Sequence, residues 1–264
     1  MTEQFSPQWS QMLEEAVSQP GLLLQAYSAF HGYSIGNQLM ALVQCQARGI
    51  EPGPIATFPG WIEKGRHVKK GERALVLCMP LTFRNKERKS ESEPEHFLGF
   101  TYKPRWFVLA QTEGSPVEPP VTPEWERERA LESLSINETA FDLTDGNVQG
   151  YARRREIAIS PLAALPHKTR FHELGHVVLG HTTEADFNDT EQTPRSLREV
   201  EAECVALICL ETLELPGTEY CRGYVQNWMK AGVETIPEQS AQKIFRAADQ
   251  ILRAGHAGER RAES

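Results

Sequence analysis

Apolar residues recur at helical spacing through the first part of the chain. The run over 9–17 predicts an amphipathic helix that ends before the Pro20-Gly21 turn. A second helix is expected over 22–30, and a third over 34–46, where Ser34 is a favourable N-cap. The first 47 residues are therefore predicted to be helical.

The pattern changes after residue 50. Short apolar runs bounded by turn residues are typical of strands. Four such runs are predicted, over 55–58, 74–78, 97–100 and 106–110. The charged segment 84–95 is expected to form an exposed loop or a hairpin tip.

A proline-rich segment divides the chain. Residues 113–123 contain four prolines and a glycine, which is typical of an extended, semi-rigid linker. We therefore expect an N-terminal domain over 1–112, a linker over 113–123 and a second domain over 124–264. In the second domain the pattern predicts helices over 124–133, 167–181, 195–215, 218–230 and 237–254, and strands over 139–143 and 156–160. The predicted fold class is α+β: N-terminal helices with a small antiparallel sheet, then a second, mainly helical domain.

Composition excludes several protein classes. With 264 residues, 40% of them hydrophobic, the chain can bury a core. No apolar run approaches the ~18 residues of a membrane helix, and the first residues do not resemble a signal peptide. None of the five cysteines forms a Cys-x-x-Cys pair, which argues against a disulfide framework. We expect a cytoplasmic protein without a membrane partner.

The net charge of −8 hides an asymmetry. Residues 61–89 hold nine basic and three acidic residues, a local charge of +6, whereas the chain after Thr112 carries −10. Because salt screens exposed charges beyond about 8–10 Å, a local basic patch can still meet a polyanion.

The sharpest chemical signal is His172-Glu173-Leu174-Gly175-His176. Histidines four residues apart lie one above the other on a helix, so both imidazoles can reach one zinc ion. Glu173 can then serve as general base toward a water at the metal. The alternative is a surface helix with a coincidental histidine pair, but the apolar flanks favour a buried helix.

A zinc site needs at least a third protein ligand, and the next predicted helix offers Glu199, Glu201 and Glu203. On a helix, Glu199 and Glu203 share a face, whereas Glu201 points roughly the other way. We predict Glu199 as the third ligand and Glu203 as a hydrogen-bond acceptor for a ligand imidazole. The alternative is a solvated acidic stripe. His181 is expected at the helix end or on the surface.

The N-terminal half carries a different combination of residues. Glycines flank a turn that projects Arg66, Lys69 and Lys70 beside Trp61, and Tyr33 and Asn37 open a predicted helix. Cations for phosphates and rings for base stacking are the features that hold single-stranded nucleic acid. The alternative is surface charge beside a tryptophan that packs in the core.

The two regions together resemble ArdC-type antirestriction proteins. The resemblance covers roughly residues 22–253 and rests on ordered motifs: Tyr33-Ser34-x-x-Asn37, Gly60-Trp61, Gly65-Arg66-x-Val68-x-Lys70-Gly71-Glu72, Gln111-Thr112-Glu113-Gly114, Lys168-Thr169-x-Phe171-His172-Glu173-Leu174-Gly175-His176, Arg198-Glu199-Val200-Glu201-Ala202-Glu203 and Tyr224-Val225-x-x-Trp228. It implies an N-terminal domain that binds single-stranded DNA and a zincin-like metallopeptidase domain with its HExxH helix.

The resemblance further implies that the protein shields incoming plasmid DNA from host restriction during conjugation. The implied partners are single-stranded DNA, through Tyr33, Asn37, Trp61, Arg66, Lys69 and Lys70, and host restriction-modification proteins. The implied cofactor is Zn²⁺, with Mn²⁺ or another divalent metal as substitute, held by His172, His176 and Glu199. A metalloprotease that uses DNA to find a protein target is the alternative function, with Glu173 as its catalytic residue.

Overall fold

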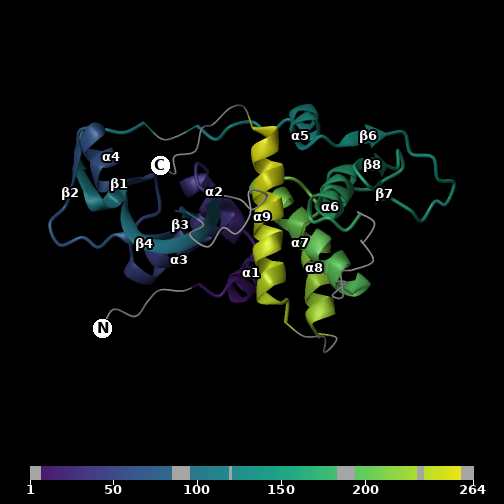
Figure 1. The fold of residues 1–264 in the computed structure, drawn as a ribbon, viewed down its shortest axis with the longest axis horizontal. Coiled ribbons are helices and arrows are strands. Elements are labelled where there is room, and N and C mark those ends of the chain that lie inside the picture. The colour runs from purple at the N-terminus through teal and green to yellow at the C-terminus, as the bar shows by residue number, and fades with distance from the viewer. Residues whose placement is uncertain (1–6, 85–95, 119–120, 183–193, 231–234, 257–264) are drawn as a thin grey trace. The chain divides into compact units, whose positions relative to one another are not determined.

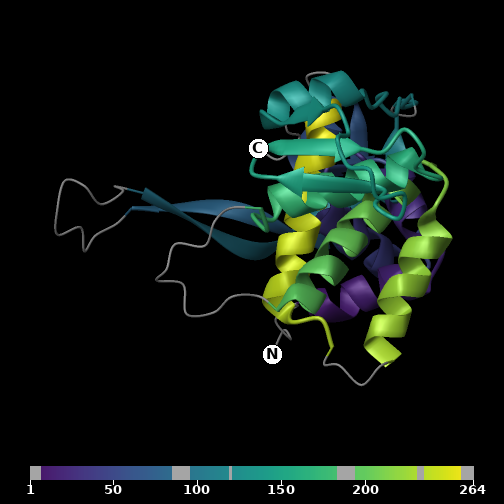
Figure 2. The same ribbon diagram turned by 90° about the vertical axis from the view of Figure 1, so that its right-hand side faces the viewer.

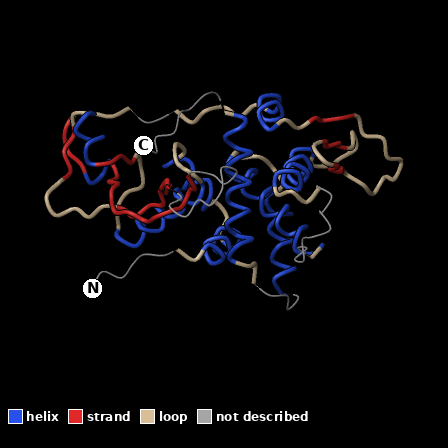
Figure 3. Tube along the Cα trace, viewed as in Figure 1, coloured by secondary structure: helices blue, strands red, loops and turns tan. Residues whose placement is uncertain are grey.

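The computed structural model describes residues 7–84, 96–118, 121–182, 194–230 and 235–256. Helices and small sheets are mixed along the chain, so the fold is α+β as predicted (Figures 1 and 3). The chain forms two compact units. Unit 1 is built on Ala29–Val121, and unit 2 joins Gln8–Ser28 to the chain from Thr122 onward. The predicted loop 84–95 and the charged tail lie almost wholly outside the described residues.

Unit 1 contains a three-stranded antiparallel sheet in the order β1-β4-β3. The two predicted strands over 97–100 and 106–110 are one long strand, β4. A second, two-stranded sheet pairs β2 with β5, which the apolar pattern does not reveal because each has three residues. The elements are α3 (Ile35–Arg48), β1 (Ile55–Thr57), α4 (Phe58–Glu63), β2 (Arg66–Val68), β3 (Leu75–Arg84), β4 (His96–Val108), η1 (Leu109–Gln111) and β5 (Thr112–Gly114), after α2 (Leu22–Phe30), which crosses from unit 2.

Side-chain amides of α3 cover the outer edge of this sheet. Asn37 Nδ2 donates to the Cys78 carbonyl at 2.9 Å, and the Cys78 N–H donates back to Asn37 Oδ1 at 2.9 Å. Gln44 pairs in the same two-way manner with the backbone of Val76, at 2.8 and 2.9 Å. An edge strand presents unpaired backbone groups, and these two amides satisfy them.

Trp61 of α4 belongs to the core of unit 1. Its side chain is only 1% exposed, and Nε1 donates to the Phe107 carbonyl at 2.8 Å. Helix α4 is capped by Thr57, whose hydroxyl accepts from the Gly60 N–H. The predicted exposure of this ring for base stacking is therefore wrong, because the ring fills the space between α4 and the sheet.

Unit 2 packs a small sheet against a group of helices. Its strand order is β6-β8-β7, with β6 parallel and β7 antiparallel to β8, and the sheet lies against α6 (Figure 2). Helix α7 is the core of the unit, and every residue from Val200 to Thr212 is buried. The elements are α1 (Trp9–Ser18), α5 (Arg127–Leu134), β6 (Asn137–Thr139), β7 (Gly150–Arg153), β8 (Glu156–Ile159), α6 (Pro166–Val178), α7 (Arg195–Thr212), α8 (Thr218–Lys230) and α9 (Glu238–Gly255).

Both ends of α1 are held by side chains more than 200 positions away. The Glu238 carboxylate accepts from the N–H groups of Trp9 and Ser10, each at 2.9 Å. At the other end, the buried Arg222 donates to the Ala16 carbonyl at 2.7 Å and pairs with Glu211. A carboxylate at the start and a guanidinium at the end of a helix match its dipole. For this reason residues 8–28 belong to unit 2, whereas the predicted N-terminal domain over 1–112 included them.

Helices α6 and α7 cross at very short range. A Cβ atom placed on Gly175 would lie 3.3 Å from the Cα, and equally from the carbonyl oxygen, of Ala202. The absent side chain at 175 therefore allows the two backbones to approach. This contact brings the faces of α6 and α7 that carry the predicted ligands together.

Gly175→Val should destabilise the protein by about 1–3 kcal/mol, because the added methyl groups must displace the backbone of α7. Gly223→Val in α8 is the matched control, since a Cβ there has no neighbour within 4 Å. Valine is the better helix former, so the control should be neutral or slightly stabilising. Urea denaturation of the two variants measures the difference, and equal midpoints would contradict the tight crossing.

Trp61→Ala should lower the free energy of unfolding by about 3–5 kcal/mol, because it leaves a large cavity. Ile62→Ala, at an exposed position of the same helix, should change it by no more than about 0.5 kcal/mol. Chemical denaturation of both variants provides the comparison. A Trp61→Ala protein as stable as the wild type would show that the ring is not part of the core.

Candidate metal centre

Two histidines of α6 and one glutamate of α7 converge on a single point. Nε2 of His176 lies 3.2 Å from Nε2 of His172, and Oε2 of Glu199 lies 3.5 Å from Nε2 of His172 and 3.7 Å from Nε2 of His176. A tetrahedral ion with ligand bonds of 2.0–2.2 Å separates its ligand atoms by about 3.3–3.6 Å. Within the described residues this is the one group of three side chains that fits a metal ion.

Glu203 lies behind His172. Its Oε2 is 2.9 Å from Nδ1 of His172, and its Oε1 is 2.8 Å from the ammonium of Lys168. A carboxylate accepts, so Nδ1 of His172 carries the hydrogen and Nε2 is left with its lone pair toward the centre. This is the place and the contact expected of Glu203.

His181 and Glu201 are the residues that the sequence interpretation missed. Nδ1 of His181 lies 3.0 Å from Nδ1 of His176, and its Nε2 lies 2.9 Å from Oε2 of Glu201. His181 lies at the end of α6, which was one of the two expected places, but both side chains are buried, so the alternative surface position of His181 is wrong. Glu201 faces this histidine and not solvent.

A helix-ending motif places His181 against His176. Gly180 has φ of +80° and its N–H donates to the Val177 carbonyl, while the His181 N–H donates to the His176 carbonyl at 2.9 Å. These two bonds define a Schellman motif, in which the second residue after the cap lies against the third-last helical residue. Gly180-His181 at the end of an apolar helix was the sequence signal for this contact.

The charges of the centre influence one another strongly. Burial by itself would lower the pKa of His172, but hydrogen bonds to Glu199 and Glu203 outweigh it and raise the pKa to about 9. The same contacts with His172 and His176 hold the pKa of Glu199 well below its usual range. Burial raises the pKa of Glu173, against the opposing effect of the two histidines, which makes this carboxylate a stronger base than an exposed one.

Three of the predicted DNA contacts are inside unit 1. Trp61 lies in the core, Tyr33 is buried with its hydroxyl donating to the Ile55 carbonyl, and Asn37 is paired with β3. Their side chains cannot meet a nucleic acid without unfolding, so these assignments are corrected.

The three predicted cations, Arg66, Lys69 and Lys70, agree better with the expected arrangement than the three buried residues do. Arg66 Nε donates to Thr112 Oγ1 at 2.8 Å, and Lys69 Nζ donates to the Ala110 carbonyl at 2.9 Å, so both help to hold β2 near β5. Lys69 and Lys70 are exposed. The basic turn is therefore accessible, although it lacks the predicted aromatic partner.

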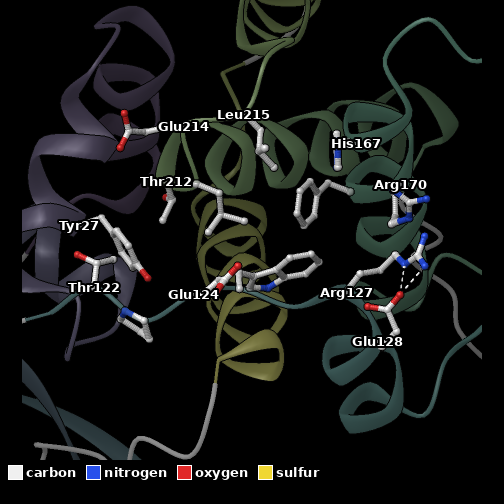
Figure 4. Close-up of a pocket in the computed structure, with 14 residues that line it drawn as sticks. Tyr27, Thr122, Glu124, Arg127, Glu128, His167, Arg170, Thr212, Glu214 and Leu215 are labelled. Carbon is white, nitrogen blue, oxygen red and sulfur yellow. Dashed lines mark hydrogen bonds and ion pairs between the residues drawn. The ribbon is translucent and has the colours of Figure 1, made fainter.

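A separate cavity of about 570 Å³ lies in unit 2 (Figure 4). It meets α6 through His167, Arg170 and Phe171, and none of the candidate metal ligands lines it. Two of its cations are already paired, Arg127 with Glu128 and Arg170 with Glu138. This cavity is therefore distinct from the metal centre.

Two family models match the chain. The N-terminal domain of anti-restriction factor ArdC matches residues 1–104, and the peptidase M78 model, described as IrrE N-terminal-like domain, matches 132–211. The second range contains every residue of the candidate metal centre. No curated protein matches the chain.

Two crystal structures of the antirestriction ArdC protein from the R388 plasmid are similar to the whole chain. The Mn(II)-bound structure has 16% sequence identity and a TM-score of 0.53 and covers 96% of this chain and 100% of that one. The metal-free structure has 18% identity and a TM-score of 0.52, with 94% of each chain covered. At these identities the likeness shows a shared fold.

None of the helices in the described ranges has the length and apolar character that crossing a bilayer requires. The order of the two matched domains agrees with the order of motifs along the chain. The chain thus carries a region that matches the N-terminal domain of anti-restriction factor ArdC, followed by a region that matches the IrrE N-terminal-like domain, and it shares the fold of the R388 ArdC structures.

Proposed function

We propose that this protein binds single-stranded DNA and one divalent metal ion, and that it protects incoming plasmid DNA from host restriction during conjugation. The observation that carries the metal assignment is the convergence of His172, His176 and Glu199 within 3.2–3.7 Å. The DNA assignment is supported by the ArdC N-terminal domain match and by the basic turn of unit 1. Host restriction-modification proteins are the proposed protein partners.

Zinc is the proposed metal. Two imidazoles and one carboxylate with an open fourth position are the donor set of catalytic zinc sites, and manganese also accepts such ligands. One of the similar R388 ArdC structures is Mn(II)-bound, which supports a divalent ion as the ligand of this chain as well.

The residues around the centre suit hydrolysis of an amide. A bound divalent ion would polarise a carbonyl and acidify a water molecule. Glu173, whose pKa is raised by burial, would accept the proton of the attacking water and pass it to the leaving group. Lys168 and Glu203 would keep His172 in the required tautomer. An active metalloprotease guided by DNA is therefore the second candidate function.

The DNA-contacting ring is proposed to be Phe58 in place of Trp61. Phe58 is 52% exposed at the start of α4, and its ring lies 6.5 Å from that of Phe107 in an edge-on arrangement. Thr57, the residue before Phe58, pairs with Trp106 of β4. The exposed Arg105 is the neighbour of Trp106 in this strand. An exposed ring beside a cation can stack on a base while the cation meets a phosphate.

The wild-type protein should bind about one divalent ion per chain, and His172→Ala/His176→Ala should bind none. Because a proton on His172, with its pKa of about 9, competes with the metal, the apparent affinity should rise with pH, by up to about tenfold per unit between about pH 7 and 9, and level off above. Metal analysis and titration at several pH values measure both. Unchanged stoichiometry in the double variant would rule out this centre.

Glu173→Gln should retain the metal and the fold but lose hydrolysis by a factor of about 10²–10⁴, since the base is not a ligand. Glu219→Gln, an exposed carboxyl on α8, is the control. Zinc-loaded protein is incubated with host restriction subunits, with and without single-stranded DNA, and cleavage is scored. Protection from restriction should survive Glu173→Gln, and its loss would favour the protease function.

Single-stranded DNA should bind more tightly than duplex DNA. Lys69→Ala/Lys70→Ala should reduce the salt dependence of binding by up to ~1.4 in log–log slope, at about 0.7 per lost phosphate contact. Phe58→Ala should weaken binding by about 1–3 kcal/mol without changing the slope, whereas Ile62→Ala should have little effect. Fluorescence anisotropy at several salt concentrations measures each variant. Preference for duplex, or binding to neither form, would overturn the DNA assignment.

A further inference from the structure

The two histidines of the candidate metal centre are supported from behind in different ways. Nδ1 of His172 meets a carboxylate directly, at 2.9 Å from Glu203. Nδ1 of His176 instead meets a second imidazole, that of His181, at 3.0 Å. His181 then reaches the Glu201 carboxylate at 2.9 Å. His176 is therefore joined to its carboxylate through an intervening ring.

When the His181 ring is neutral, hydrogen-bonding capacity fixes the direction of this chain. An ionised carboxylate only accepts, so Nε2 of His181 carries a hydrogen and Nδ1 of the neutral ring is an acceptor. That acceptor faces Nδ1 of His176, which must donate. Nε2 of His176 is left with its lone pair, and it is this atom that lies 3.2 Å from Nε2 of His172 and 3.7 Å from Glu199.

The side chains of Glu201 and His181 are both buried. The Glu201 side chain is 2% exposed and the His181 side chain 8%. A carboxylate removed from water needs hydrogen-bond donors, and Glu201 has His181 together with Ser240 of α9. The Schellman motif at Gly180 holds the backbone of His181 beside the last turn of α6.

We propose that His181 and Glu201 are positioning residues for His176: they fix its ring and its tautomer so that Nε2 is directed toward the metal. The inference rests on the proposed metal centre. It assigns a role to each of the first three glutamates of α7, with Glu199 at the metal, Glu203 behind His172 and Glu201 behind His176. Partners of this kind typically change metal affinity by a factor of 10–100.

The test is the zinc dissociation constant of the full-length protein. Bound metal is first removed by chelation, and the constant is then measured by competition with a chromogenic chelator. His181→Ala should weaken zinc binding by a factor of about 10–100, and Glu201→Gln by a smaller factor. His181→Ala/Glu201→Gln should bind no more weakly than His181→Ala, because the two groups act in series. His181→Asn can present an acceptor to His176 and should recover part of the loss.

His167→Ala is the matched control, because this histidine is on the same helix but is exposed and outside the chain of contacts. It should bind zinc within a factor of two of the wild type. Near-ultraviolet circular dichroism of the metal-free proteins reports the fold, and the absorption spectrum of the cobalt-loaded proteins reports the geometry at the ion. The spectrum should change in His181→Ala and not in His167→Ala.

The outcomes separate this inference from the proposed function. If His181→Ala binds zinc as tightly as His167→Ala, the positioning role is overturned and the metal centre stands. Should His181→Ala not fold, the same conclusion follows if His181→Asn and Glu201→Gln both bind zinc as tightly as His167→Ala. If the wild type binds no metal, or binds it equally well without His172 and His176, the metal centre fails and the inference fails with it.

Discussion

The candidate metal centre depends on how closely α6 and α7 cross. Gly175 meets Ala202 at the crossing, where one added carbon would come within 3.3 Å of the α7 backbone. The ligand region is arranged symmetrically about this contact. His172 and His176 lie three residues before and one after Gly175, and Glu199 and Glu203 have the same offsets from Ala202. A larger residue would separate the two faces, and the distances of 3.5 and 3.7 Å from Glu199 to the two imidazoles, which suit a metal, would be lost.

Acidic residues of α7 are accommodated in the centre of unit 2 because each has a basic partner. Glu203 is shared by His172 and Lys168, and Glu201 is bound by His181. Burying a carboxylate without such a partner is costly, so the residues that orient the histidines also make it possible to bury the helix that carries them. Function and stability therefore depend on the same contacts in this part of the protein.

The N-terminal half shows the opposite division of roles. Its aromatic and amide residues stabilise the fold: Trp61 fills the core, and Asn37 and Gln44 satisfy the edge of a sheet. Exposed groups such as Lys70 and Phe58 remain for a ligand. The motifs on which the family resemblance rests thus contain buried residues that stabilise the fold as well as exposed residues that are available to a ligand. Only their burial in the structure distinguishes the two kinds.

The sequence by itself determined the α+β class, the HExxH helix, the ligand set His172, His176 and Glu199 as a hypothesis, and the place of Glu203, because these follow from helical periodicity and from the chemistry of side chains four residues apart. The tertiary structure decided what depends on contacts between distant segments. The partner of Glu201 follows from a turn at Gly180, the burial of Trp61 from packing against β4, and the membership of α1 in unit 2 from Glu238 and Arg222. Periodicity shows which face of an element is buried but not which other element covers it.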